Sequence, residues 1–204
     1  VFAAVGVHPH ETKAFDEDRV VPALEKLAVS TKVVAIGEIG LDYFYDHSPK
    51  QDQQRALAAQ LALAERLGKP VLLHNRESEE DLLAILEERA AGSPERPRGV
   101  FHSFCASTAT GERAIALGYL VSYSGMITFR MAENARESAA ALPLGAMLVE
   151  TDAPYLAPAP FRGKPNEPAF VAKTASRLAQ VKGVAPEEVA RVTTANFRRL
   201  FGTP

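Results

Sequence analysis

Short runs of valine, leucine and isoleucine return along this chain at intervals that suit a sheet of buried parallel strands. Each run is too short for a helix and too apolar for a half-exposed strand, which is typical of a strand covered on both faces. The segments between the runs have helical period and end signals, so we predict an α/β fold with a parallel sheet. The six expected strands cover residues 2–7, 33–36, 71–73, 100–101, 120–123 and 147–149.

Proline and glycine indicate where the intervening helices begin and end. Ser48 and Pro49 open a helix that Gly68 should end, and a capping pattern at residues 78–81 opens one that should end near Gly92. A further helix is expected at 131–141, and the last helices lie between residues 169 and 201, after a Pro-rich loop at 157–168. Strands and helices therefore alternate up to that loop.

Six strands are too few for a closed (β/α)₈ barrel, which typically needs about 250 residues. We therefore expect a TIM-like (β/α) barrel that lacks its first two βα units, with residues 1–204 forming a single domain. The rival fold is an open doubly wound sheet. No G-x-G-x-x-G follows any expected strand, and polar residues occur at the ends of many strands rather than at one switch point, so the barrel is favoured.

Composition limits the classes of partner. The formal net charge of −2 excludes a globally basic surface of the kind that binds duplex DNA tightly, so any nucleic-acid contact should be local. Cys105 is the one cysteine, which rules out an internal disulfide and favours a reducing compartment, the cytoplasm. No apolar run approaches the roughly 20 residues that span a bilayer. We expect no membrane association and see no sign of an obligate protein partner.

Four polar residues follow apolar runs and are candidate metal ligands. A lone histidine after a strand is usually a hydrogen-bonded loop residue, and a lone acid there is often a helix cap. Four such residues at the converging strand ends of one barrel favour a metal site instead. Imidazole and carboxylate together suit zinc, manganese or iron, and magnesium when phosphate oxygens complete the shell. The candidates are Glu38, His74, His102 and Asp152, whereas His47 is expected to be solvated.

The chain resembles the TatD family of metal-dependent deoxyribonucleases from its first residue to Gly202. GEIGLDY and ETDAPY together are highly specific, whereas GVHPH alone would be weak. The matching segments, in order and spacing, are GVHPHE (6–11), AIGEIGLDY (35–43), LLHNRE (72–77), FHSF (101–104), ETDAPYL (150–156), RGKPNEP (162–168) and TTANFRRLF (193–201).

The resemblance implies a site with up to two divalent cations (Mg²⁺, Mn²⁺ or Zn²⁺) that hydrolyses DNA phosphodiesters, often from a 3′ end. It implies that Glu38 bridges the cations, that His74 and His102 bind one, and that Asp152 binds the other; Glu38 and Asp152 are the expected catalytic residues. The family's remaining ligands are an H-x-H pair ahead of these blocks. His8 and His10 belong to the separate GxHPH block, so we expect the second cation to be held poorly by this stretch alone.

Substrate contact is expected from positive and polar residues near the same strand ends. Arg76 lies two residues past His74, while Arg162, Lys164 and Asn166 lie in the loop after the last strand, where barrels often hold phosphate. The family block implies that His8 and His10 contact the scissile phosphate. The expected partner is DNA, as strand ends or short single strands. Two alternatives stay open: a barrel hydrolase acting on an amide, lactone or small phosphoester, and a non-catalytic barrel with a partial metal site.

Overall fold

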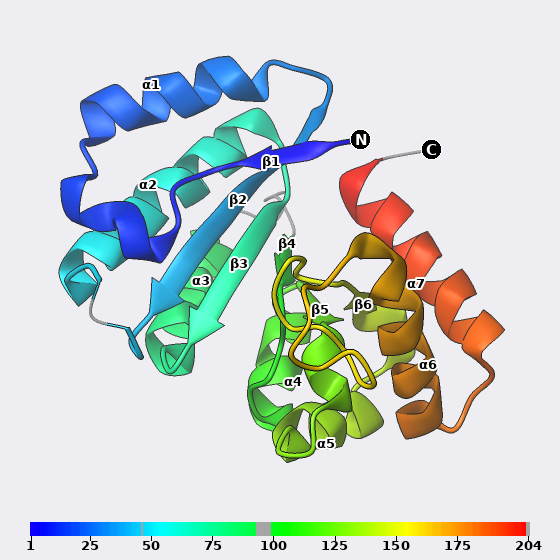
Figure 1. Cartoon of the computed structure of the whole chain (residues 1–204). Helices are drawn as coiled ribbons and strands as arrows, with labels where there is room; N and C mark the ends of the chain where they lie inside the picture. The colour runs from blue at the N-terminus through cyan, green and yellow to red at the C-terminus, as the bar shows by residue number, and fades with distance from the viewer. Residues whose placement is uncertain (46, 93–98, 203–204) are drawn as a thin grey trace. The chain divides into compact units, whose positions relative to one another are not determined.

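A computed structural model describes residues 1–45, 47–92 and 99–202. The chain divides into two compact units, coloured in sequence order in Figure 1. Unit 1 comprises Val1–Val100 with Leu200–Gly202, and unit 2 comprises Phe101–Arg199. We describe each unit by itself, and the expectation of a single domain stays a prediction.

Unit 1 is a parallel β-sheet with helices packed against it (Figure 1). Its strands follow one another in sequence order, β1-β2-β3, as successive βα units require. Helix α2 packs against β2, and α1 packs against α2. The elements are β1 (Ala3–Val5), the 3₁₀ helix η1 (Pro9–Ala14), α1 (Glu17–Ala28), β2 (Val33–Asp42), α2 (Lys50–Leu67), β3 (Val71–Arg76) and α3 (Glu79–Gly92).

The core of unit 1 follows from the apolar character of its strands. Ile36, Ile39 and Leu41 of β2 are completely buried, as is Leu73 of β3. Each such side chain contributes roughly 1.5–3 kcal/mol relative to exposure, which holds the sheet against α2. Helix α2 ends at Gly68, whose φ of 61° is the left-handed conformation that favours glycine. The expected end of this helix is confirmed.

Unit 2 contains the parallel pair β5 (Leu120–Tyr123) and β6 (Met147–Val149). Tyr123 is buried, and its hydroxyl forms a 3.0 Å hydrogen bond with Ser138 Oγ. Burial raises the pKa of Tyr123 to about 12. Strand β4 (Gly99–Phe101) lies at the boundary of the two units. The helices are α4 (Thr108–Ala116), η2 (Gly125–Thr128), α5 (Glu133–Ala141), η3 (Leu144–Ala146), η4 (Pro168–Phe170), α6 (Val171–Lys182) and α7 (Pro186–Phe201).

All six expected strands occur, but two of them are longer than the apolar runs suggest. β2 continues to Asp42 and β3 to Arg76, because the parallel ladder goes on through Gly40 opposite His74 and Asp42 opposite Arg76. Glu38 and His74 therefore lie inside strands, which corrects their expected placement at strand ends. Among the described residues, no helix is long and apolar enough to cross a membrane.

Candidate metal centre

The ladder between β2 and β3 brings Glu38 and His74 together. Gly40 lies opposite His74 in the register and has a φ of 142°, a conformation that favours glycine. A Cβ atom on Gly40 would overlap the backbone carbonyl of His74. A glycine at this position of the GEIGLDY block therefore allows β3 to approach β2 closely enough for the two side chains to meet.

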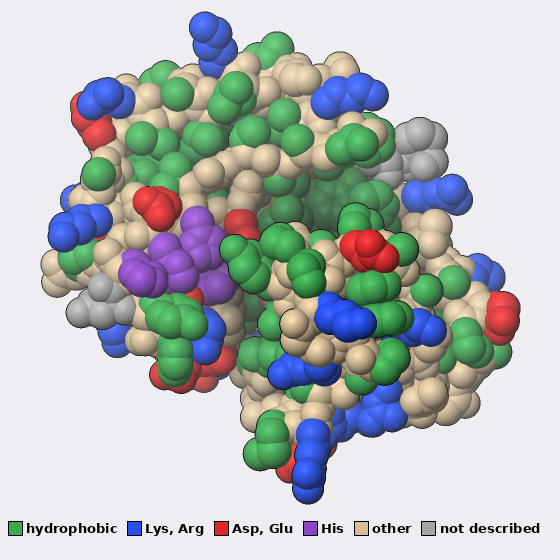
Figure 2. Space-filling view, in the orientation of Figure 1, with side chains coloured by type: hydrophobic (Ala, Val, Ile, Leu, Met, Phe, Trp, Pro, Cys, Tyr) green, Lys and Arg blue, Asp and Glu red, His purple; other side chains and the backbone are tan. Residues whose placement is uncertain are grey.

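The Glu38 carboxylate lies among imidazoles. Its Oε1 is 2.8 Å from Nδ1 of His74 and 3.4 Å from Nε2 of His8. His8, His10 and His74 each offer a ring nitrogen, and these atoms lie within 4.8 Å of one another. Figure 2 shows the resulting patch of histidine side chains on the surface. Strand β2, strand β3 and the start of η1 thus supply a compact set of nitrogen and oxygen donors.

Asp42 supports this cluster from inside the protein. Its side chain is 1% exposed. Oδ2 lies 2.9 Å from Nε2 of both His10 and His74, while Oδ1 accepts the backbone N–H groups of Phe44 and Tyr45. Burial raises the pKa of Asp42, but hydrogen bonds from the Tyr45 backbone, His10 and His74 outweigh it, so the pKa lies below its ordinary value. Asp42 is therefore an ionised acceptor.

The ionised Asp42 decides which nitrogen of His74 is available to a ligand. A carboxylate only accepts, so Nε2 of His74 carries the proton it donates to Asp42. The other ring nitrogen, Nδ1, lies 2.8 Å from Glu38 Oε1, so it is the atom that the neutral form of this ring offers to a ligand. A ring nitrogen and a carboxylate oxygen that lie this close both carry lone pairs, so the contact is favourable only with a proton or a cation between them. Imidazole and carboxylate are ligands that zinc and manganese bind, so the residues fit a divalent cation.

Unit 2 repeats the pairing of an imidazole with a carboxylate. Glu150 Oε1 lies 3.2 Å from Nδ1 of His102 and accepts the backbone N–H of Ser103 at 2.9 Å. A proton on Nδ1 leaves Nε2 of His102 as the ligating atom. Asp152 follows β6 in a turn, with a φ of 59° and its carbonyl accepting the N–H of Tyr155. His102 and Asp152 thus both belong to unit 2.

The loop after β6 carries the expected basic residues. Arg162 and Lys164 line a pocket of about 390 Å³ together with Tyr155 and Phe129, and the Arg162 guanidinium lies 3.5 Å from the centre of the Phe129 ring. This pocket combines two positive charges with aromatic surface, which suits an anionic, flat ligand.

Asn166 is held inside the loop by hydrogen bonds, and its expected contact with substrate stays a prediction. Its side chain is buried, and its Nδ2 donates at 2.6 Å to the carbonyls of both Thr151 and Tyr155. Its Oδ1 accepts the N–H of Glu167. These bonds link Asn166 to both sides of the loop that carries Asp152.

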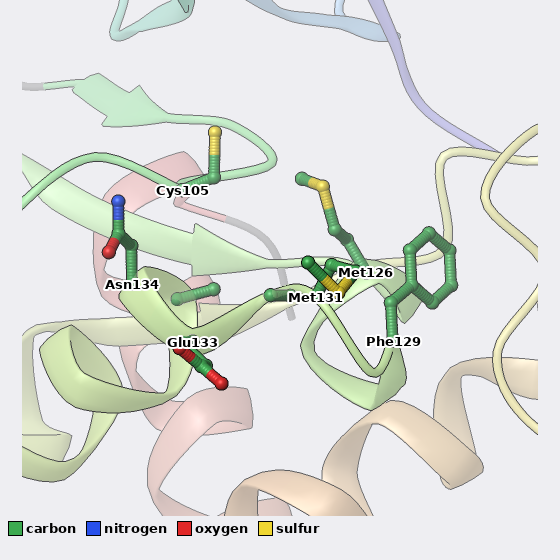
Figure 3. Close-up of a pocket in the computed structure, with 8 residues that line it drawn as sticks. Cys105, Met126, Phe129, Met131, Glu133 and Asn134 are labelled. Carbon is green, nitrogen blue, oxygen red and sulfur yellow. The ribbon is translucent and has the colours of Figure 1, made fainter.

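A second pocket of about 330 Å³ lies nearby in unit 2 and is lined mainly by apolar side chains (Figure 3). Met126, Met131 and Phe129 line it, and Cys105, which is exposed, lines it as well. Phe129 borders both this pocket and the basic one. An apolar pocket beside a basic one suits a ligand that has both an apolar and an anionic part.

Two carboxylates that sequence reasoning did not include among the site residues support the imidazoles. Asp42 and Glu150 stand in the signature segments as the D of GEIGLDY and the first residue of ETDAPY. Their position in those segments was the available signal. Their partners depend on strand register, which sequence does not show. His47, expected to be solvated, is exposed, and its ring packs against those of His10 and Tyr45.

Comparisons with known proteins agree with this arrangement. The family model described as TatD related DNase matches residues 1–202. The uncharacterized metal-dependent hydrolase YcfH of Escherichia coli K12 is 44% identical over 98% of this chain and 74% of its own length. YabD of Bacillus subtilis, also named as a metal-dependent hydrolase, is 38% identical over 98% of this chain and 77% of its own length.

Solved structures give the fold. The crystal structure of YjjV, a TatD homologue of E. coli K12, matches with a TM-score of 0.90 and 35% identity, over all of this chain and 77% of that one. A TatD family hydrolase of Entamoeba histolytica matches with a TM-score of 0.84 at 22% identity, over 98% of this chain and 74% of that one. The expected TIM-like barrel class is confirmed. The chain belongs to the TatD family of metal-dependent hydrolases.

Proposed function

We propose that this protein is a deoxyribonuclease that hydrolyses phosphodiester bonds at strand ends and in short single strands of DNA. Support for a metal-dependent hydrolase comes from the family and from the Glu38, His74 and Asp42 array. Support for a phosphodiester substrate comes from the description of the family and from the pocket that Arg162 and Lys164 line.

The observation that carries the proposal is the contact between Glu38 Oε1 and Nδ1 of His74, whose other ring nitrogen contacts Asp42. We assign Glu38, His74, His102 and Asp152 as the residues that would hold up to two divalent cations, Mg²⁺, Mn²⁺ or Zn²⁺. Bound divalent cations lower the pKa of water and stabilise charge on phosphate oxygens. Within unit 1, Nε2 of His74 contacts Asp42, which leaves Nδ1 as the ring nitrogen on the side of Glu38.

The residues of the chain have separate tasks in the proposed hydrolysis. Water attacks the phosphorus as the P–O bond to the leaving oxygen breaks; the Asp152 carboxylate accepts the proton of the water, and the leaving oxygen takes up a proton from solvent. No serine or cysteine nucleophile is required. Nε2 of His8 faces Glu38 at 3.4 Å, and Nδ1 of His8 accepts the backbone N–H of His10 at 3.2 Å. That bond leaves the His8 proton on Nε2, where it can donate to an anionic oxygen. Arg162 and Lys164 supply positive charge to neighbouring phosphates.

A substrate survey tests this proposal. Oligonucleotides labelled at the 5′ or the 3′ end, as single strands and as duplexes, are compared with an amide, a lactone and a small phosphomonoester, each with added Mg²⁺, Mn²⁺ or Zn²⁺. We expect the highest kcat/KM with single-stranded DNA and a ladder of products that shortens from the 3′ end. Faster turnover of the amide, lactone or phosphomonoester would favour another hydrolase, and cation binding without hydrolysis would favour a non-catalytic barrel.

A further inference from the structure

Two exposed aromatic side chains follow strand β2, after Tyr43. Phe44 is 50% exposed and Tyr45 is 41% exposed. Their rings meet edge to face, with centroids 4.8 Å apart. Burial of rings of this size normally contributes to stability, so a pair left in water on one surface indicates a binding function.

Arg76 adds a positive charge to these rings. Its guanidinium carbon lies 3.9 Å from the Phe44 centroid and 4.7 Å from the Tyr45 centroid, which is within cation–π distance of both. Arg76 is itself exposed, at the last position of β3. We call Phe44, Tyr45 and Arg76 the aromatic shelf. The two rings supply flat apolar surface, and the guanidinium of Arg76 can donate hydrogen bonds to a phosphate.

The aromatic shelf is fixed to the candidate metal centre by the same carboxylate that orients His74. Oδ1 of Asp42 accepts the backbone N–H groups of both Phe44 and Tyr45, at 3.1 and 3.0 Å. Asp42 also lies opposite Arg76 in the ladder between β2 and β3. The ring of His10, which contacts Asp42, lies 5.4 Å from that of Tyr45. Figure 2 shows hydrophobic and basic side chains at the edge of the histidine patch.

We propose that the aromatic shelf stacks unpaired bases of a single DNA strand whose backbone passes the candidate metal centre. This inference rests on the proposed function and names the feature of the substrate that the site reads. Every base offers a π face, so stacking on Phe44 and Tyr45 requires no particular sequence. Paired bases inside a duplex do not expose these faces. Stacking therefore predicts a preference for single strands that does not depend on a high positive charge, in keeping with the net charge of −2.

Binding to a strand with and without bases tests the shelf. We would measure fluorescence anisotropy in Mg²⁺ with a short phosphorothioate oligothymidylate, which resists hydrolysis, and with an abasic phosphorothioate of equal length and charge. The protein should bind the oligothymidylate at least roughly tenfold more tightly, as stacking of one or two bases predicts. A Phe44→Ala/Tyr45→Ala double variant should lose this difference, whereas Tyr45→Phe, which keeps the ring, should retain it.

Phe2 offers a matched control within unit 1. It is 42% exposed and has the Lys32 ammonium 5.4 Å from its ring, but it precedes β1, remote in sequence from the GEIGLDY block. Phe2→Ala should leave both affinities unchanged. The proposal that the aromatic shelf stacks bases would be overturned by any of three results: equal binding of the two strands, no binding of either strand, or an undiminished preference in the double variant. Hydrolysis of bis(p-nitrophenyl) phosphate, followed in parallel, reports on the proposed function separately, because this diester has no strand of bases.

Discussion

Both units pair a candidate ligand imidazole with a carboxylate, but they support the pair differently. In unit 1, Asp42 is 1% exposed and is approached by four nitrogen atoms, two from imidazoles and two from the backbone. In unit 2, Glu150 is 22% exposed and is approached by His102 and by one backbone N–H. A buried carboxylate whose oxygens all accept hydrogen bonds holds its imidazole partner in one tautomer more firmly than a partly exposed carboxylate with fewer hydrogen bonds. The orientation of His74 is therefore the more tightly determined.

Removal of the His74 imidazole should have the largest effect. His74→Ala deletes one candidate ligand and leaves Glu38 and Asp42 without their shared partner. We expect hydrolysis of bis(p-nitrophenyl) phosphate to fall by more than about 100-fold, beyond what loss of a supporting residue causes. Steady-state kinetics and metal content measure this. His47→Ala removes an exposed ring of the same patch and should keep the diester activity; equal losses in both variants would show that the patch matters only as a whole.

Substitution of Asp42 should have the next largest effect. Asp42→Asn keeps the shape but places an NH₂ group where an acceptor is needed, so Nε2 of His74 would become the acceptor and the proton would move to Nδ1. We expect divalent cations to bind roughly 10–100-fold more weakly. Calorimetric titration with Mn²⁺ gives the affinity, and ¹⁵N shifts of the His74 ring report the tautomer. An unchanged tautomer and affinity would contradict the role assigned to Asp42.

The corresponding change in unit 2 sharpens the comparison. Glu150→Gln removes the charge beside His102 but leaves a carbonyl oxygen that can still accept the two N–H groups. We expect the loss of Mn²⁺ affinity to stay near the lower end of the range for supporting residues, about tenfold or less. The same titration measures it. A loss greater than that of Asp42→Asn would reverse the ranking of the two units.

The smallest effects should come from the basic loop of unit 2. Arg162→Ala and Lys164→Ala each remove a charge from the pocket that follows β6. Each should raise KM for an oligonucleotide severalfold and reduce the slope of log affinity against log salt by about 1, with little change for bis(p-nitrophenyl) phosphate. Steady-state kinetics with both substrates, and oligonucleotide affinity at several salt concentrations, measure these effects separately. A wild-type slope steeper than about −5 would imply more phosphate contacts than we assign here.

The strands and the end of α2 at Gly68 could be predicted from the sequence, because each depends on local chemistry. Sequence reasoning did not single out α1, whose interior contains Pro22 and whose residues are mostly exposed. The sequence of a helix shows a clear repeat of apolar residues only where one face of that helix is extensively buried. The apolar runs likewise located β2 but not its polar continuation to Asp42.

The candidate ligands could be predicted from residue type and family blocks, whereas their supports could not. Glu38 and His74 are in contact, inside strands rather than after them, and their role as metal ligands stays a prediction. Asp42 and His74 are 32 residues apart in sequence, so their contact depends on the register of the two strands that carry them. The burial of Asn166 could not be predicted either, because a polar residue in a loop is normally exposed.

The central claim is that hydrolysis depends on a cation held through Glu38 and His74. The most direct measurement is cleavage of a 5′-labelled single-stranded oligonucleotide by metal-stripped protein, before and after Mn²⁺ is restored, with Glu38→Gln assayed alongside. We predict no cleavage without the cation, recovery when it is added to the natural protein, and no recovery in Glu38→Gln. Cleavage by the stripped protein, or full recovery in Glu38→Gln, would contradict the account.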